Sequence, residues 1–363
     1  MTSIQRALAA AGLFGVALLV YLLSWPVPVD PVAWTPPAAP GFTGDFAKND
    51  SLAGLERVPI DGLAGPEGLT VSPAGTLYTT SHEGWLLRQV GERFERWVST
   101  GGRPLGIEWD AATDRLLVAD AYRGLLAVTS SGAIETLVDA VDGEPLVYAD
   151  DVSVASDGKI YFSEASTKFG AEAYGGTYEA SLLDILEHGG QGRVLVFDPE
   201  TKTTEVLLDG LQFANGVALG PDESALFVVE TGMYRVLRVP LDGSGPPEPV
   251  LENLPGFPDN IERTEDILWV GLVSARKPIV DATAGSPFVR RILQRLPAFL
   301  RPEATRYAHV VGFDASGAVL YNLQDHAPGA FSRTTGALEA GGYLYVSSLH
   351  EPTLGRIPWP PPR

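Results

Sequence analysis

The chain has 363 residues and is acidic, with a formal net charge of −19, a sequence pI of about 4.6 and no cysteine. Contacts with nucleic acid phosphates require lysine and arginine, so this charge balance argues against nucleic acid as a partner. The lack of cysteine excludes disulfides, thiolate zinc sites and cysteine nucleophiles.

Residues 1–25 are predicted to form an N-terminal transmembrane anchor. Ala7 to Leu23 are apolar or small without interruption, and a helix needs about 20 such residues to cross a bilayer. Arg6 precedes this run and Asp30 follows it. This charge order favours an N-terminus inside and a propeller on the exported side, whether periplasmic, extracellular or lumenal. A cleaved signal peptide is the alternative.

Residues 26–51 are predicted to be a proline-rich linker. Six prolines stand between positions 26 and 40, and such a segment is extended and stiff, as in a spacer between membrane and domain. The folded domain is expected to begin near Leu52 and to span residues 52–363.

From there the sequence repeats six times. Each copy has a small or polar residue, a short apolar strand, a turn and a second apolar strand; the small residues are Gly68, Gly106, Asp151, Gly216, Asn260 and Gly336. A propeller blade takes about 40–50 residues, so the long intervals 151–216 and 260–336 each hold one blade and an insertion. The prediction is an all-β, six-bladed β-propeller, with a β-sandwich as the alternative. Residues 55–58 are expected to complete the last blade beside residues 354–357.

In a four-stranded blade, the start of the inner strand and the end of the second strand lie on one face, here called the top. Both insertions follow second strands, so both are predicted on the top face. The first, about 164–190, contains a helix-like segment at 178–187, and the second, about 275–303, has helical spacing at 288–296. Its arginines suggest a lid that also touches anionic lipid, or a helix whose arginines pair with the protein's own carboxylates.

The residues just before the inner strands occupy equivalent places around the mouth of the central channel. In chain order they are Glu67, Leu105, Asp150, Asn215, Asp259 and Thr335. Glu67, Asp150, Asn215 and Asp259 carry the oxygen donors that Ca²⁺ prefers. Three carboxylates at one narrow mouth would repel one another without a cation. One calcium ion on the axis is therefore predicted, with simple capping of turns as the alternative.

Several motifs resemble a known family: Gly65-Pro66-Glu67-Gly68, Tyr148-Ala149-Asp150-Asp151, Gly192-Arg193-Val194-Leu195, Phe213-Ala214-Asn215-Gly216-Val217 and Pro255-Gly256-Phe257-Pro258-Asp259-Asn260-Ile261. They are similar to the strictosidine synthase-like branch of the calcium propellers related to regucalcin, gluconolactonase and paraoxonase, and in particular to the membrane-anchored adipocyte plasma membrane-associated proteins. The resemblance implies that Glu67, Asp150, Asn215 and Asp259 hold calcium. The family usually has asparagine where this chain has Asp150, a change expected to tighten cation binding and weaken the metal as an electrophile.

The resemblance also implies a calcium-dependent hydrolase of small lactones or esters, with the metal polarising the carbonyl and Asp259 as base or nucleophile. His82 and His350 follow the second strands of blades 1 and 6, which are neighbours in a closed ring, so both are candidate catalytic residues on the top face. Rim histidines that bond to loops are the alternative. Two other functions stay open. One is the amine–aldehyde condensation of strictosidine synthases, whose glutamate would fall within residues 332–335. The other is a non-catalytic ligand-binding propeller.

Overall fold

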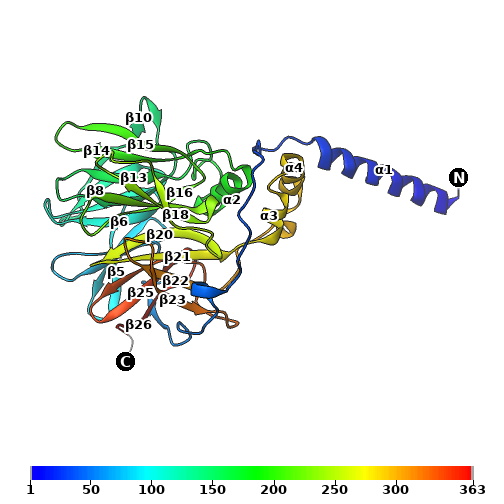
Figure 1. Ribbon diagram of the computed structural model, residues 1–363. Coiled ribbons are helices and arrows are strands. Elements are labelled where there is room, and N and C mark those ends of the chain that lie inside the picture. The colour runs from blue at the N-terminus through cyan, green and yellow to red at the C-terminus, as the bar shows by residue number, and fades with distance from the viewer. Residues whose placement is uncertain (1, 361–363) are drawn as a thin grey trace.

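Six four-stranded antiparallel sheets make up most of the structure, a computed structural model that describes residues 2–360 (Figure 1). The ends of the predicted anchor and propeller ranges, Met1 and residues 361–363, lie outside the described residues. Blade 1 consists of β2 (Leu69–Val71), β3 (Leu77–Thr80), β4 (Trp85–Val90) and β5 (Arg93–Ser99). Blade 2 consists of β6 (Pro104–Asp110), β7 (Arg115–Asp120), β8 (Gly124–Thr129) and β9 (Ile134–Val138). Blade 3 consists of β12 (Ala149–Val154), β13 (Ile160–Glu164), β14 (Gly192–Asp198) and β15 (Thr203–Leu211).

Blades 4 to 6 follow the same order and close the ring. Blade 4 consists of β16 (Ala214–Leu219), β17 (Ala225–Glu230), β18 (Arg235–Pro240) and β19 (Glu248–Leu251). Blade 5 consists of β20 (Gly256–Thr264), β21 (Ile267–Ala275), β22 (Ala308–Phe313) and β23 (Val319–Asp325). Blade 6 consists of β24 (Thr334–Ala340), β25 (Tyr343–Ser348), β26 (Thr353–Pro358) and β1 (Glu56–Pro59). A two-stranded ribbon, β10 (Ala140–Val141) and β11 (Glu144–Pro145), extends from blade 2.

Inner strands contact one another in the cyclic order β2, β6, β12, β16, β20 and β24, and β24 returns to β2. The predicted six-bladed propeller is confirmed. β1 pairs with β26, as expected, with Arg57 opposite Gly355 and Val58 opposite Leu354. The start and end of the domain therefore share one sheet, and the ring has no open edge.

The repeated small residues allow the inner strands to approach closely around the axis. A Cβ atom on Gly216 would lie 2.5 Å from the backbone nitrogen of Ile261 in the next blade. The apolar core lies between neighbouring blades, as where Phe227 of blade 4 meets Phe313 of blade 5 with 6.3 Å between ring centroids.

Both insertions form helices on one face of the propeller, as predicted (Figure 1). The first contains α2 (Thr177–Glu187), and the second contains α3 (Pro278–Thr283), α4 (Pro287–Arg295) and the 3-10 helix η3 (Ala298–Leu300). The remaining 3-10 turns in the described residues are η1 (Gly44–Phe46) and η2 (Thr231–Met233).

The N-terminal helix α1 (Ser3–Ser24) projects away from the propeller and has no buried residue (Figure 1). By length and composition it could cross a membrane. The segment after it is extended, as predicted, but it is bound along the propeller rather than hanging free. The amide of Val32 donates to the carbonyl of Glu187 (2.8 Å), Trp34 stacks on His188 with 3.9 Å between ring centroids, and Arg276 donates to the carbonyl of Pro37 (2.9 Å).

The close approach of inner strands predicts that Gly216→Ala will destabilise the fold by about 1–3 kcal/mol, because the added Cβ must push backbone atoms of β20 apart. Denaturant unfolding followed by tryptophan fluorescence measures this. Gly245→Ala is the matched control, since a Cβ there meets no atom within 4 Å. Equal stability of the two variants would show that the inner strands can separate without cost.

Candidate metal centre and its cavity

The backbone irregularity at the start of the inner strands places the predicted ring residues. In blades 2 to 6 the pairing of inner and second strand shifts register across the ring position, for example between Ala149 and Val152 and between Ala214 and Val217. A bulge re-aims the side chain that it contains. The sequence predicted these residues just before the inner strands; Glu67 does precede β2, but in blades 2 to 6 the ring residue lies inside the strand, at a bulge that the sequence did not predict.

Four of the ring residues line one cavity of about 550 Å³ on the top face, and all four are buried: Glu67, Asp150, Asn215 and Asp259. The other two ring residues, Leu105 and Thr335, do not line it. The hydroxyl of Thr335 instead donates to the main-chain carbonyl of Glu67 (3.1 Å), which ties blade 6 to blade 1.

Two oxygens of this group have no hydrogen-bond partner. The amide nitrogen of Asn215 donates to Oδ1 of Asp259 (2.8 Å), which leaves Oδ1 of Asn215 buried and unpaired, and Oδ1 of Asp150 is also buried and unpaired. A buried acceptor without a donor is costly, so both oxygens are suited to a cation. Within residues 2–360 no three Asp, Glu or His side chains come close enough to hold a metal on their own.

Arg103 is a member of this site that sequence reasoning missed. Its guanidinium is buried, 1% exposed for the whole residue, and Nη2 donates to Oε2 of Glu67 (2.5 Å). Nη1 donates to the carbonyl of Pro104 (3.1 Å). The positive charge of Arg103 therefore compensates the charge of Glu67, and the hydrogen bond fixes the position of the Glu67 carboxylate.

A sequence signal for this arginine existed. Arg103 stands two residues before Leu105, and Arg333 stands two residues before Thr335, so the two ring positions without a carboxylate or amide both have an arginine at the same offset. Arg333 also lines the cavity, and its Nε is buried without a partner.

The electrostatics of the cluster oppose full ionisation. Burial, followed by the charges of Glu67 and Asp259, raises the pKa of Asp150 well above its ordinary value. Burial and the charge of Glu67 do the same to the pKa of Asp259, and burial raises the pKa of Glu67 against the opposing effect of Arg103. Burial and mutual repulsion thus oppose the simultaneous ionisation of the three carboxyl groups, and Arg103 offsets this only for Glu67.

The two candidate catalytic histidines lie together at the rim. The rings of His82 and His350 are 6.4 Å apart between centroids, as expected for neighbouring blades, and His350 meets the ring of Tyr178 edge-on at 5.3 Å. Neither lines the cavity. Desolvation by surrounding loops, then the charge of Arg333, lowers the pKa of His350 to about 4, so this imidazole is neutral at pH 7.

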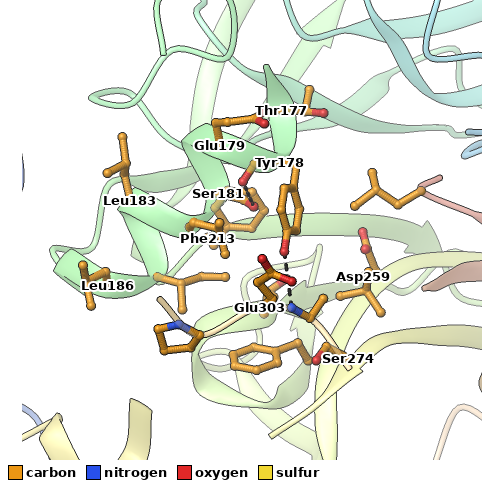
Figure 2. A pocket seen from close by; sticks show the side chains of 18 of the residues that line it. Thr177, Tyr178, Glu179, Ser181, Leu183, Leu186, Phe213, Asp259, Ser274 and Glu303 are labelled. Carbon is orange, nitrogen blue, oxygen red and sulfur yellow. Dashed lines mark hydrogen bonds between the residues drawn. The ribbon is translucent and has the colours of Figure 1, made fainter. Parts of the chain in front are cut away.

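The cavity roof consists of the two insertions and is largely apolar. Leu183 and Leu186 of α2 and Leu293 of α4 contribute to it. The hydroxyl of Tyr178 accepts a hydrogen bond from the amide of Ala304 (3.3 Å), which joins the two insertions (Figure 2).

The lid arginines bind mainly to backbone carbonyls of the chain itself. Arg290 donates to the carbonyls of Leu186 (2.8 Å) and Ala284 (2.9 Å), and Arg301 donates to that of Leu296 (2.8 Å). Arg291 forms an ion pair with Asp30. This agrees with the alternative prediction that the arginines of the second insertion pair with the protein's own carboxylates. These guanidinium groups therefore fasten the lid to the linker and to α2, and do not form a free basic surface.

Arg103→Met is predicted to lower the stability of the metal-free protein by about 3–5 kcal/mol, because Glu67 would stay buried without its cation. Arg115→Met is the control, since its partner Glu135 is exposed, and should change stability by at most about 1 kcal/mol. Adding Glu67→Gln to Arg103→Met should restore much of the loss. Thermal unfolding in chelator tests this, and equal effects of the two arginine variants would contradict it.

Comparison with known proteins places this architecture in a family. A family model described as strictosidine synthase matches residues 150–244, and one described as strictosidine synthase-like, N-terminal, matches residues 44–89. Among solved structures, a gluconolactonase from Xanthomonas campestris superimposes with a TM-score of 0.61 at 18% identity and covers 84% of this chain and 88% of its own. The calcium-binding protein regucalcin from Agrobacterium tumefaciens gives 0.56 at 15% identity, with 83% and 91% covered. At these identities the likeness shows the shared fold.

Alignments with curated relatives cover most of the chain. The strictosidine synthase-like protein 6 of Arabidopsis thaliana is 34% identical over 308 residues, covering 82% of this chain and 80% of that protein. The adipocyte plasma membrane-associated protein of Salmo salar is 31% identical over 368 residues, covering 94% and 86%. With a six-bladed propeller, matching family models and relatives of this extent, the chain belongs to the strictosidine synthase-like family.

Proposed function

We propose that this protein is a calcium-dependent hydrolase of lactones or esters whose active site is the top-face cavity. The observation that carries the proposal is the convergence of Glu67, Asp150, Asn215 and Asp259 on one cavity, with unpaired buried oxygens on Asp150 and Asn215. The shared fold with a gluconolactonase and with a calcium-binding protein supports the same conclusion.

The donor set suits calcium. Carboxylate and amide oxygens are hard ligands, and the site offers neither cysteine nor a lining histidine, which zinc would prefer. A bound calcium ion would polarise the substrate carbonyl and stabilise the oxyanion that forms.

Asp259 is the proposed base or nucleophile. The amide of Asn215 donates to its Oδ1 and so fixes the orientation of the carboxylate. His82 and His350 are proposed to assist from the rim: the imidazole of His350, with its pKa lowered to about 4, is neutral at pH 7 and can accept a hydrogen bond, although neither ring reaches the cavity wall in this conformation. Arg333 has a buried, unpaired Nε in the wall and can orient a substrate oxygen.

Where the condensing enzymes of the family would carry a glutamate, near the start of the sixth inner strand, this cavity presents Arg333. A guanidinium stays protonated and is a poor base, so the geometry favours hydrolysis over amine–aldehyde condensation. A binding protein without turnover remains the competing function, and it predicts calcium binding without catalysis.

The proposed location is a membrane, with α1 as the anchor and the propeller on the exported side. The apolar helix and the relationship to plasma membrane-associated proteins support anchoring. The orientation follows from the order of Arg6 and Asp30 around the apolar run.

Asp259→Asn and Asn215→Ala are each predicted to lower calcium-dependent hydrolysis at least about 100-fold, because each removes part of the preorganised charge at the reacting carbonyl. A panel of lactones and aryl esters, assayed with and without chelator, measures this. Leu105→Met is the matched control: the residue occupies the ring but offers no oxygen, so activity should stay near wild type. Full activity in either site variant would refute the assignment.

The raised carboxyl pKa values also predict how stability depends on pH. A carboxyl whose folded pKa exceeds its unfolded value binds more protons in the folded state, so the metal-free protein should lose stability as pH rises from about 4 upward. Calcium replaces those protons, so its stabilising effect should grow as pH rises above about 4, the ordinary carboxyl pKa. Melting temperatures with excess calcium and with chelator test this. Asp150→Asn should weaken the trend, and a calcium effect that does not vary with pH would contradict it.

A further inference from the structure

The lid has an outer surface that is unusually apolar. It consists of Phe288 and Val289 from α4, Phe299 and Leu300 from η3, and Ile279 from α3, and we refer to it as the apolar lid surface. Phe299 is 78% exposed and Phe288 is 53% exposed. Soluble proteins rarely leave a contiguous group of large apolar side chains in water, so such a group indicates contact with another apolar phase.

The lid is fastened directly to the end of the N-terminal helix. The guanidinium of Arg295 in α4 donates to the carbonyls of Leu22 (2.9 Å) and Trp25 (2.5 Å), and the hydroxyl of Tyr21 donates to the carbonyl of Arg295 (3.0 Å). Figure 1 shows α1 leaving the molecule beside α4. Tyr and Trp are typical of the interface between lipid tails and water, so the end of α1 places α4 at that depth.

The linker segment between α1 and the propeller is too short to let the propeller move away from the bilayer. Val32 is already bound to Glu187 and Trp34 to Ala284 through backbone hydrogen bonds. Only the few residues between Trp25 and Val32 separate the helix end from the propeller. A bilayer crossed by α1 would therefore meet the lid.

The same insertion lines the cavity on its inner side. Leu293 and Ala298 belong to the wall, and Ala298 is also exposed, as is Leu182 of α2. Residues that are both lining and exposed mark the mouth, which thus lies next to Phe299. Glu179 and Glu303 also line the cavity and are exposed, so the mouth carries both apolar and acidic side chains.

We propose that the apolar lid surface is inserted into the bilayer that α1 spans, and that the cavity takes its substrates from that bilayer. The substrate class is then an amphiphile with an alkyl chain and an ester or lactone headgroup. This inference rests on the proposed function for the hydrolytic site and on α1 as a membrane anchor. The chain's own carbonyls and Asp30 already bind the lid arginines, so insertion depends on apolar contact and does not need anionic lipid.

The full-length chain without native cysteine allows a direct test. In the Phe299→Cys variant the introduced thiol is labelled with an environment-sensitive nitrobenzoxadiazole fluorophore. The labelled protein is then reconstituted into phosphatidylcholine vesicles. Val90→Cys is the control, since Val90 is 47% exposed and lies at the end of β4, on the face opposite the lid. We expect blue-shifted emission for position 299, quenched by lipids with spin labels on their acyl chains, and water-like emission for position 90.

Three outcomes would overturn the proposal. Water-like emission at position 299 would place the lid in solvent. A blue shift without quenching by spin-labelled lipid would show that protein, such as a second copy, covers the surface. A requirement for phosphatidylserine would show attraction to headgroups rather than apolar insertion.

Activity tests the substrate class separately. Phe299→Ser combined with Leu300→Ser should lower kcat/KM about tenfold for a long-chain lactone carried in the vesicles and leave a short, water-soluble ester unaffected. Equal losses on both substrates would overturn delivery from the bilayer. If neither substrate is hydrolysed by the wild type, the proposed function fails, whereas the labelling result still decides whether the lid is inserted.

Discussion

The mutual repulsion of buried carboxylates around one axis is the constraint on which the rest of the site depends. A propeller brings the starts of its inner strands to a common mouth, so acidic residues at equivalent positions must share a small, poorly solvated space. Glu67, Asp150 and Asp259 line one buried cavity and raise the pKa values of their neighbours, and Arg103 binds Glu67. The burial of these carboxylates therefore opposes their full ionisation.

The roof determines which molecules could reach that cluster. α2 and the second insertion cover the mouth with leucine side chains, and the bond between Tyr178 and Ala304 joins them (Figure 2). The cavity thus combines the carboxylates and amide of the propeller ring with the leucine side chains of the insertions. Such a combination suits a substrate whose reacting group is polar and whose remainder is hydrophobic.

Helix α1, the linker and the lid are joined by hydrogen bonds. Arg290 and Arg295 bind backbone carbonyls of α2, the lid and α1, so the positive charges that first suggested contact with lipid headgroups serve instead to hold these segments together. A guanidinium has several donors in a fixed plane and can satisfy two or more carbonyls at once. The linker, which its prolines keep extended, lies in contact with the propeller for the same reason: its backbone finds partners there.

By itself the sequence determined the number of blades, their closure by residues 55–58, the face that carries the insertions and the four oxygen-bearing residues of one cavity. It could do so because a repeat places equivalent residues at equivalent positions, whatever the distance between them in the chain. Only the tertiary structure showed that Arg103 binds Glu67, that His82 and His350 stay outside the cavity, and that Arg295 holds the end of α1. These contacts join segments with no shared pattern, and their geometry depends on how side chains pack once the ring has closed.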